Sequence, residues 1–268
     1  MHYPFKGTCS LDRLRKQVPL VQCITNDVAM NFAANVLTAL GASPVMAFAP
    51  EEAATFTKNA DCLTVNLGIL TSEKLNGILS STQIAKDLNK PIVLDPVAHF
   101  VSSFRQQAVD KILALNPTVI RGNGSEILTF SEKSSAKGVD SGNATEDSIF
   151  TAIELAKKYK TIVAVSGEND FITDGVNHFK ISGGHPLMAK VSATGCALTC
   201  AVGAFVALAP DAPLQGTLAA FNIFSIAGKI VGERARGPGS FVPQFLDTLY
   251  SLNDEIIDKF DLMESLTI

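Results

Sequence analysis

Residues 91–123, PIVLDPVAHFVSSFRQQAVDKILALNPTVIRGN, decide the fold. The stretch begins with the short apolar run PIVLDP, which is typical of a strand covered on both faces. SFRQQAVDKILAL follows as a predicted helix, and PTVIRGN is again a predicted strand. A strand, a helix and a second strand in this order predict a parallel pair of strands joined by a crossover helix.

The same alternation continues along the chain in both directions. Strands are predicted at 19–25, 43–48, 62–68 and 161–167, helices at 27–41, 71–89, 125–130 and 145–159, a hairpin at 169–182, and nearly continuous helix over 194–236. At least five alternations favour an α/β fold, with a mostly parallel central sheet and helices on both faces. No repeat or low-complexity linker divides residues 1–268, so we expect a single domain.

Turn and capping residues predict where several of these elements begin and end. Thr25 or Asn26 is expected to cap the helix at 27–41, and Gly41 to end it. The hairpin is expected to turn at Asp174-Gly175, and Ser240 to cap a last amphipathic helix. Residues 131–144 are the most loop-like part of the chain.

Composition and charge exclude several classes of protein. The formal net charge is −4, and no basic run is interleaved with aromatic residues, which argues against nucleic acid or an anionic membrane as partner. Neither a signal-peptide core nor an uninterrupted apolar stretch of membrane-spanning length is found. The five scattered cysteines are typical of a reduced, cytoplasmic protein. Only 18% of the residues are charged, which points to a large core or to subunit contacts.

Polar and unusual residues gather where the predicted strands end, and ligands of open parallel sheets bind at that edge. The residues in these positions are Asn26 and Asp27, Met46, Asn66 and Gly68, Asp95, Arg121 to Asn123, and Ser166 with Gly167.

Three charged residues point to phosphate chemistry. A guanidinium leaving a buried strand, as at Arg121, favours an anion, and phosphate suits its geometry. Asp95 and Glu126 could share a magnesium ion, which commonly binds through one or two carboxylates and phosphates. Asp95 before proline could equally form a turn, and Glu126 could cap a helix; both interpretations stay open. The four histidines have no ligand spacing and are expected at the surface or in loops.

The segment VSATGCALTCAVGAF, residues 191–205, places a thiol at the start of an apolar helix. The first amides of a helix have no partners within it, so with the helix dipole they form an anion site. Gly195 would let another group approach the backbone, and the position is expected to lower the pKa of Cys196. The alternative is a buried apolar cysteine, which is the expectation for Cys200. No P-loop or protein-kinase signature is found.

An ordered set of motifs resembles the hydroxyethylthiazole kinase family, within the ribokinase-like superfamily. The resemblance covers about residues 18 to 250, and its motifs are CITNDVAMNFAANVLTALGASPVMA, VNLGIL, IVLDPV, VIRGNGSEIL, GVDS, VSGENDFITDG, ATGCALTCAVGAFVA and GPGSF. It implies transfer of the γ-phosphate of ATP to the hydroxyl of 4-methyl-5-(2-hydroxyethyl)thiazole in thiamine salvage. It also implies a homotrimer with thiazole sites at the subunit interfaces.

The resemblance also assigns roles to matching residues. It makes Cys196 the catalytic residue, and Asp95 and Glu126 the acidic pair near Mg²⁺. Substrate-binding residues would be Asn26, Met46, Gly68, Ala193 and Gly195, and ATP-binding residues Arg121, Asn123, Ser166 and Gly167.

Three positions depart from the family pattern. Ala193 replaces a glycine, and would be strained if the backbone there needs a positive φ. Ala98, His99 and Phe100 replace a glycine-rich loop, and Ser166 replaces a threonine. The first two departures bear on substrate choice rather than on the type of reaction.

Three other functions are weighed against this one. A related kinase could act on a hydroxymethylpyrimidine, although Cys196 and the TNDV motif favour the thiazole. A thiazole or nucleotide sensor could keep the fold and lose the chemistry. A cysteine hydrolase would need a histidine beside Cys196, for which His99 is the one candidate.

Overall fold

The computed structural model describes residues 9–131 and 144–268. The loop predicted at 131–144, except for its two end residues, therefore lies outside the described residues. So do His2 and the GVDS motif at 138–141.

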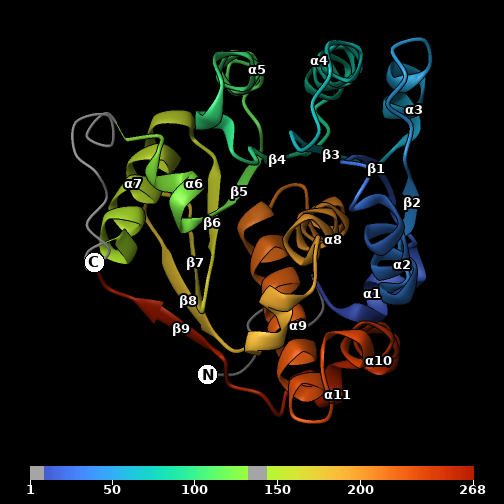
Figure 1. Ribbon diagram of the computed structural model, residues 1–268, viewed down its shortest axis with the longest axis vertical. Coiled ribbons are helices and arrows are strands. Elements are labelled where there is room, and N and C mark those ends of the chain that lie inside the picture. The colour runs from blue at the N-terminus through green and yellow to red at the C-terminus, as the bar shows by residue number, and fades with distance from the viewer. Residues whose placement is uncertain (1–8, 132–143) are drawn as a thin grey trace.

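Nine strands in the described part of the chain form one sheet (Figure 1). In sheet order these are β2 (Ser43–Val45), β1 (Leu20–Ile24), β3 (Cys62–Asn66), β4 (Ile92–Asp95), β5 (Val119–Asn123), β6 (Ile162–Ser166), β7 (Asn169–Thr173), β8 (His178–Ser182) and β9 (Met263–Leu266). The first six are parallel and the last three antiparallel. The predicted mostly parallel α/β sheet is confirmed.

Helices cover both faces of the sheet, as Figure 1 shows. One face carries α1 (Leu11–Gln17), α2 (Met30–Leu40), α8 (Thr194–Leu208), α9 (Pro213–Gly232) and α10 (Pro238–Ser251). The other carries α3 (Ala53–Asn59), α4 (Ser72–Asp87), α5 (Ser103–Leu113), α6 (Gly124–Leu128) and α7 (Ala144–Tyr159). Shorter elements are α11 (Asp254–Ile257) and the 3₁₀ helices η1 (His99–Val101) and η3 (Pro186–Lys190).

The strands send alternate side chains into two separate cores. Val21 and Cys23 of β1 pack on the face of α8, whereas Ile24 packs on the face of α4. Leu63 and Val65 of β3 join the second core. This double burial explains why the strands are continuous apolar runs.

Several predicted boundaries are wrong. The helix expected at 27–41 begins at Met30, because Asn26 closes a preceding turn by accepting the Ala29 N–H at 3.1 Å. Gly41 ends this helix at φ 101°, as predicted. The α10 helix begins at Pro238 with Gly237 as N-cap, so Ser240 lies inside its first turn and accepts the Arg236 N–H instead.

The region 194–236 is almost wholly helical, as predicted, and consists of the two helices α8 and α9. Among the described residues one helix, α9, is long and apolar enough to cross a membrane. However, 78% of its most apolar window is buried inside the protein, as expected of a core helix. The hairpin turns at Asp174-Gly175 as predicted, with Gly175 at φ 90°.

Candidate functional site

A chain of polar side chains connects the carboxyl ends of five parallel strands. Asn26 Nδ2 donates to Asn66 Oδ1 at 2.9 Å, and Asn66 Nδ2 donates to Asp95 Oδ2 at 2.8 Å. Arg121 Nη1 lies 3.6 Å from the same carboxylate oxygen, and Arg121 Nη2 donates to Ser166 Oγ. Residues far apart in the sequence thus form one network at the edge where ligands were predicted to bind.

Cys196 lies beside this network at the start of α8. Its Sγ accepts hydrogen bonds from Asn66 Nδ2 at 3.3 Å and from Asn26 Nδ2 at 3.5 Å. Burial raises the pKa of the thiol to about 11, and the Asp95 carboxylate adds to the rise. The prediction of a lowered pKa is therefore wrong, and Cys196 is a neutral thiol at pH 7. Cys200, one turn further, is buried against Thr64, in agreement with a packing role.

Asp95 is buried and held from several sides. Besides Asn66 and Arg121, Thr199 of α8 donates to its Oδ2 at 2.9 Å. Burial raises the pKa of Asp95; Arg121 opposes this rise, and the nearby Glu126 carboxylate reinforces it. A second carboxylate that raises the pKa of Asp95 favours a cation or a proton beside it.

Glu126 caps the start of α6. Its Oε2 accepts the Asn123 N–H at 2.9 Å, while Asn123 Oδ1 accepts the Glu126 N–H at 2.9 Å. Its Oε1 accepts the Ala98 N–H at 3.1 Å, which ties the loop after β4 to this helix. Of the two sequence-based interpretations, the capping role is thus present. Within residues 9–131 and 144–268, no group of three or more His, Cys, Asp or Glu residues could hold a metal ion, so a metal would have to complete its coordination elsewhere.

Arg121 reaches its position because residue 195 has no side chain. A Cβ on Gly195 would stand 2.7 Å from Arg121 Nη1 and 2.8 Å from Nη2. The group that Gly195 admits to the backbone is therefore the guanidinium of Arg121. Just before it, Ala193 adopts φ 66°, in the left-handed region, so the strain considered from the sequence is present.

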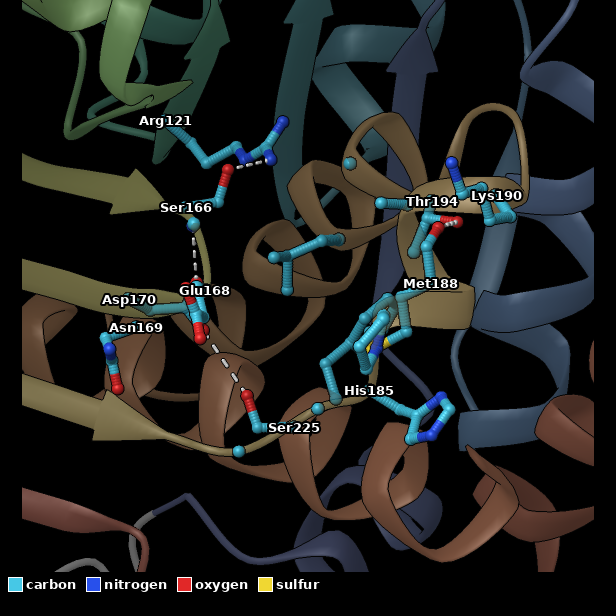
Figure 2. Close-up of a pocket in the computed structure, with 18 residues that line it drawn as sticks. Arg121, Ser166, Glu168, Asn169, Asp170, His185, Met188, Lys190, Thr194 and Ser225 are labelled. Carbon is cyan, nitrogen blue, oxygen red and sulfur yellow. Dashed lines mark hydrogen bonds between the residues drawn. The ribbon is translucent and has the colours of Figure 1, made fainter. Parts of the chain in front are cut away.

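A cavity of about 980 Å³ opens beside Arg121 (Figure 2). Four predicted site residues line it: Arg121, Ser166, Gly167 and Gly195. The upper part of the view in Figure 2 holds Arg121, Thr194 and Lys190. The lower part holds Asp170, Ser225 and His185. The cavity thus pairs a cationic end with a polar, partly apolar end.

Sequence reasoning missed part of this lining. Asp170 belongs to the SGEND segment that follows β6, where its place after a strand was a usable signal. Its Oδ1 accepts the Gly167 N–H at 3.0 Å, and Ser225 Oγ donates to its Oδ2 at 3.3 Å. Burial raises the pKa of this carboxyl to about 6. Lys190 was also missed. It lies in η3, which does not follow a parallel strand, so its position in the sequence gave no indication of a site.

The remaining predicted residues are not among those that line the cavity. The Gly68 N–H donates to Asn66 Oδ1 at 2.9 Å, and a Cβ there would stand 2.8 Å from Asn26 Nδ2. Met46 is half-buried after β2 and does not line the cavity, and Asn123 is exposed at its helix cap. The site therefore has two parts, the cavity and the cluster around Cys196, which meet at Arg121 and Gly195.

The expectation of surface or loop histidines is wrong at two positions. His99 is buried in η1, stacks on Phe130 with ring centroids 4.2 Å apart, and lies 3.2 Å from Thr129 Oγ1. His178 is buried in β8 and bonded to Thr173. The contacts of His99 are with Phe100, Phe130 and Thr129 rather than with Cys196, so the pair that a cysteine hydrolase would need is not formed.

Comparisons with known proteins agree with this geometry. A model of the Hydroxyethylthiazole kinase family matches residues 11–255. A hydroxyethylthiazole kinase of Rhizobium rhizogenes is 50% identical over 250 residues, which cover 93% of each chain. The solved structure of hydroxyethylthiazole kinase from Pyrococcus horikoshii has a TM-score of 0.87 at 37% identity, covering 96% of this chain and 97% of that one. A ribokinase-like superfamily protein from Enterococcus faecalis shares the fold at 14% identity, with a TM-score of 0.57 and coverage of 90% and 94%.

Proposed function

The chain belongs to the hydroxyethylthiazole kinase family, and we propose that it transfers the γ-phosphate of ATP to the hydroxyl of 4-methyl-5-(2-hydroxyethyl)thiazole in thiamine salvage. One observation carries the proposal: the cavity beside Arg121 and the cluster around Cys196 share a border at Gly195. A phosphoryl donor on one side and an acceptor alcohol on the other would meet there.

The cavity takes ATP, with the phosphates at its cationic end. The guanidinium of Arg121 lines this end of the cavity, and its planar group of N–H donors suits phosphate oxygens. Lys190 and the first amides of α8, at Thr194 and Gly195, add positive potential at the same end. Ser166 and Gly167 complete the binding of the nucleotide, with Asn123 at the adjoining helix cap.

Asp95 and Glu126 are the residues that would hold Mg²⁺. The Glu126 carboxylate contributes to the raised pKa of Asp95, and a divalent cation bound between them would relieve this repulsion. Glu126 already accepts two backbone N–H groups, so it suits contact through metal-bound water, which magnesium commonly retains. When bound with ATP, the ion would neutralise phosphate charge.

Cys196 orients the hydroxyl of the acceptor; its thiolate form accepts the alcohol proton late in the reaction, as the new O–P bond forms, and afterwards releases it to solvent. The two amides that donate to Sγ fix the position of the sulfur, which leaves the thiol as one end of a hydrogen bond to the alcohol. With a pKa of about 11, Cys196 must first lose its own proton, and only a small fraction of the protein carries the thiolate at pH 7. Phosphoryl transfer through a loose transition state tolerates this, because it needs little early deprotonation of the alcohol.

The acceptor binds among Asn26, Met46, Gly68 and the backbone of Ala193 and Gly195. Close to two of these residues, Val28 is 61% exposed and Ile69 is 46% exposed. Exposed apolar side chains beside a site suit a subunit interface. The proposal therefore includes a homotrimer with thiazole sites at its subunit interfaces. It also includes a location in the cytoplasm.

Purified protein with ATP and Mg²⁺ tests the function when ADP release is followed with each acceptor alcohol separately. We expect release with the thiazole alcohol well above that with 4-amino-5-hydroxymethyl-2-methylpyrimidine. The reverse preference would assign the protein to pyrimidine phosphorylation. Binding of the thiazole without any ADP release would identify a sensor.

A further inference from the structure

Lys74 of α4 is a buried lysine next to the acceptor side of the site. Its side chain is 4% exposed, although lysine is almost never fully buried without partners. Nζ donates to the Thr25 carbonyl at 3.2 Å and to Asp27 Oδ1 at 3.2 Å. It also lies 5.0 Å from the centre of the Phe48 ring. The ammonium is thus satisfied by two oxygens and one aromatic face.

These partners come from two segments that carry proposed acceptor-binding residues. Thr25 and Asp27 flank Asn26, whose amide donates to Cys196 Sγ. Phe48 lies two residues after Met46. One ammonium therefore connects the segment that follows β1 with the segment that follows β2.

Further contacts hold the second segment against the same helix. A Cβ on Gly77, one turn after Lys74, would stand 2.0 Å from the Phe48 carbonyl oxygen, so α4 packs directly on this backbone. Gln22 of β1 donates to the Ala47 carbonyl at 2.9 Å from the other side. These two contacts hold the backbone of Ala47 and Phe48 between α4 and β1. Lys74 is the charged group that joins this segment to the segment around Asn26.

We propose that Lys74 is a positioning residue for the acceptor alcohol, which sets the placement of Asn26 relative to Met46. The inference rests on the proposed function, because it assigns these two segments to acceptor binding. A compact ammonium suits the task, since it bonds three groups in different directions from one atom. None of the three partners lines the nucleotide cavity, so the effect should be confined to the acceptor.

Steady-state kinetics of Lys74→Met test the proposal, because methionine keeps the apolar stem and removes the ammonium. We expect the KM for the thiazole alcohol to rise roughly tenfold and kcat to fall up to about 10²-fold, the range of an ångström-scale misplacement. The KM for ATP should stay within about twofold, a split that general destabilisation does not produce.

Lys90→Met is the matched control. The Lys90 ammonium also donates to backbone carbonyls, those of Lys58 and Ala60 at the end of α3, away from both segments. We expect it to lower the thermal midpoint without changing either KM. Equal effects of the two variants on both KM values, or a wild-type KM for the alcohol in Lys74→Met, would overturn the proposal.

Two milder variants keep the inference testable if Lys74→Met does not fold. Asp27→Asn removes the negative charge that pairs with Lys74, and Phe48→Leu removes the aromatic face beside it; a rise in the alcohol KM of about two- to threefold is expected for each. An unchanged KM in both would refute the positioning role. If the wild-type protein phosphorylates the pyrimidine alcohol instead, the proposed function fails, and the same variants measured with that acceptor still decide the role of Lys74.

Discussion

The guanidinium of Arg121 occupies the space where residue 195 would carry a side chain. Both terminal nitrogens of Arg121 lie within 2.8 Å of the position that a Cβ on Gly195 would take. Since α8 begins at Thr194, the arginine packs against the first turn of the helix that carries Cys196. This contact places the proposed phosphate-binding cation next to the residue proposed to contact the acceptor.

Gly195→Ala should separate these two groups. The methyl group would displace Arg121, and a shift of about an ångström is expected to lower kcat/KM for ATP by roughly 10²-fold. Gly239→Ala is the control, because Gly239 is also the second residue of its helix but has no atom within 4 Å of a Cβ. Steady-state kinetics of both variants check this, and similar losses in the two would contradict the role of the contact.

Substitutions of Cys196 separate a base from a positioning group. Cys196→Ala should lower turnover by roughly 10²–10⁴, the usual share of a general base. Cys196→Asp should retain most of the turnover or exceed it, because a carboxylate ionised at pH 7 can accept the Asn26 and Asn66 hydrogen bonds. Initial rates of both variants at saturating ATP and alcohol decide between the role of a base and that of a positioning group. Near-normal turnover of the alanine variant would show that Cys196 is not needed, without affecting the kinase assignment.

The reactivity of Cys196 toward iodoacetamide should follow its raised pKa. With a pKa of about 11, the thiolate fraction increases about tenfold for each pH unit between 7 and 10. The alkylation rate of this partly exposed thiol, measured by mass spectrometry, should rise in parallel; the other four cysteines are buried. An alkylation rate that no longer rises above pH 7 would mean that the pKa of Cys196 is low, as predicted from the sequence.

That disagreement illustrates what the sequence does and does not determine. The start of a helix was visible in ATGC, and helix amides favour a thiolate. The burial of the thiol between two asparagines and its closeness to Asp95 are tertiary features, and they dominate. In contrast, the strand-end rule correctly brought together Asn26, Asp95 and Arg121, because the carboxyl ends of parallel strands lie at the same edge of a sheet.

The lining of the cavity beside Arg121 was predictable only in part, for the same reason. Arg121 and Ser166 follow parallel strands, so their shared edge could be inferred. Lys190 and His185 come from a 3₁₀ turn whose position depends on packing against α9, for which sequence spacing carries no signal. His99 was misjudged because its burial depends on Phe130, 31 positions away, as a stacking partner.

The buried carboxyl of Asp170 predicts a pH dependence of stability. Its pKa is raised from about 3.8 to about 6, so between these values the folded protein holds a proton that the unfolded chain has released. The free energy of unfolding therefore falls as pH rises through this window. Asp170→Asn should be close to the wild type near pH 4 and be more stable by about 2–3 kcal/mol at pH 7.5, as urea unfolding at both values would measure. A constant difference between the two proteins would show that the pKa is not shifted.

Ala193→Gly should stabilise the protein, although glycine usually destabilises. Ala193 adopts φ 66°, where an L-residue with a Cβ is strained by roughly 1–2 kcal/mol, and glycine is not. The greater freedom of glycine in the unfolded chain offsets about 0.4–1 kcal/mol of that gain, so about 0.5–1 kcal/mol should remain. Ala114→Gly provides the contrast, because Ala114 also caps a helix but at φ −63°, and there only the unfavourable contribution applies. Urea unfolding should therefore give shifts of opposite sign in the free energy of unfolding for the two variants.

The same variant also tests whether the strain at Ala193 serves the reaction. Since Ala193 offers only its backbone to the proposed acceptor site, turnover of Ala193→Gly should stay within about twofold of the wild type. A clear loss of turnover would mean that the strain itself serves the reaction.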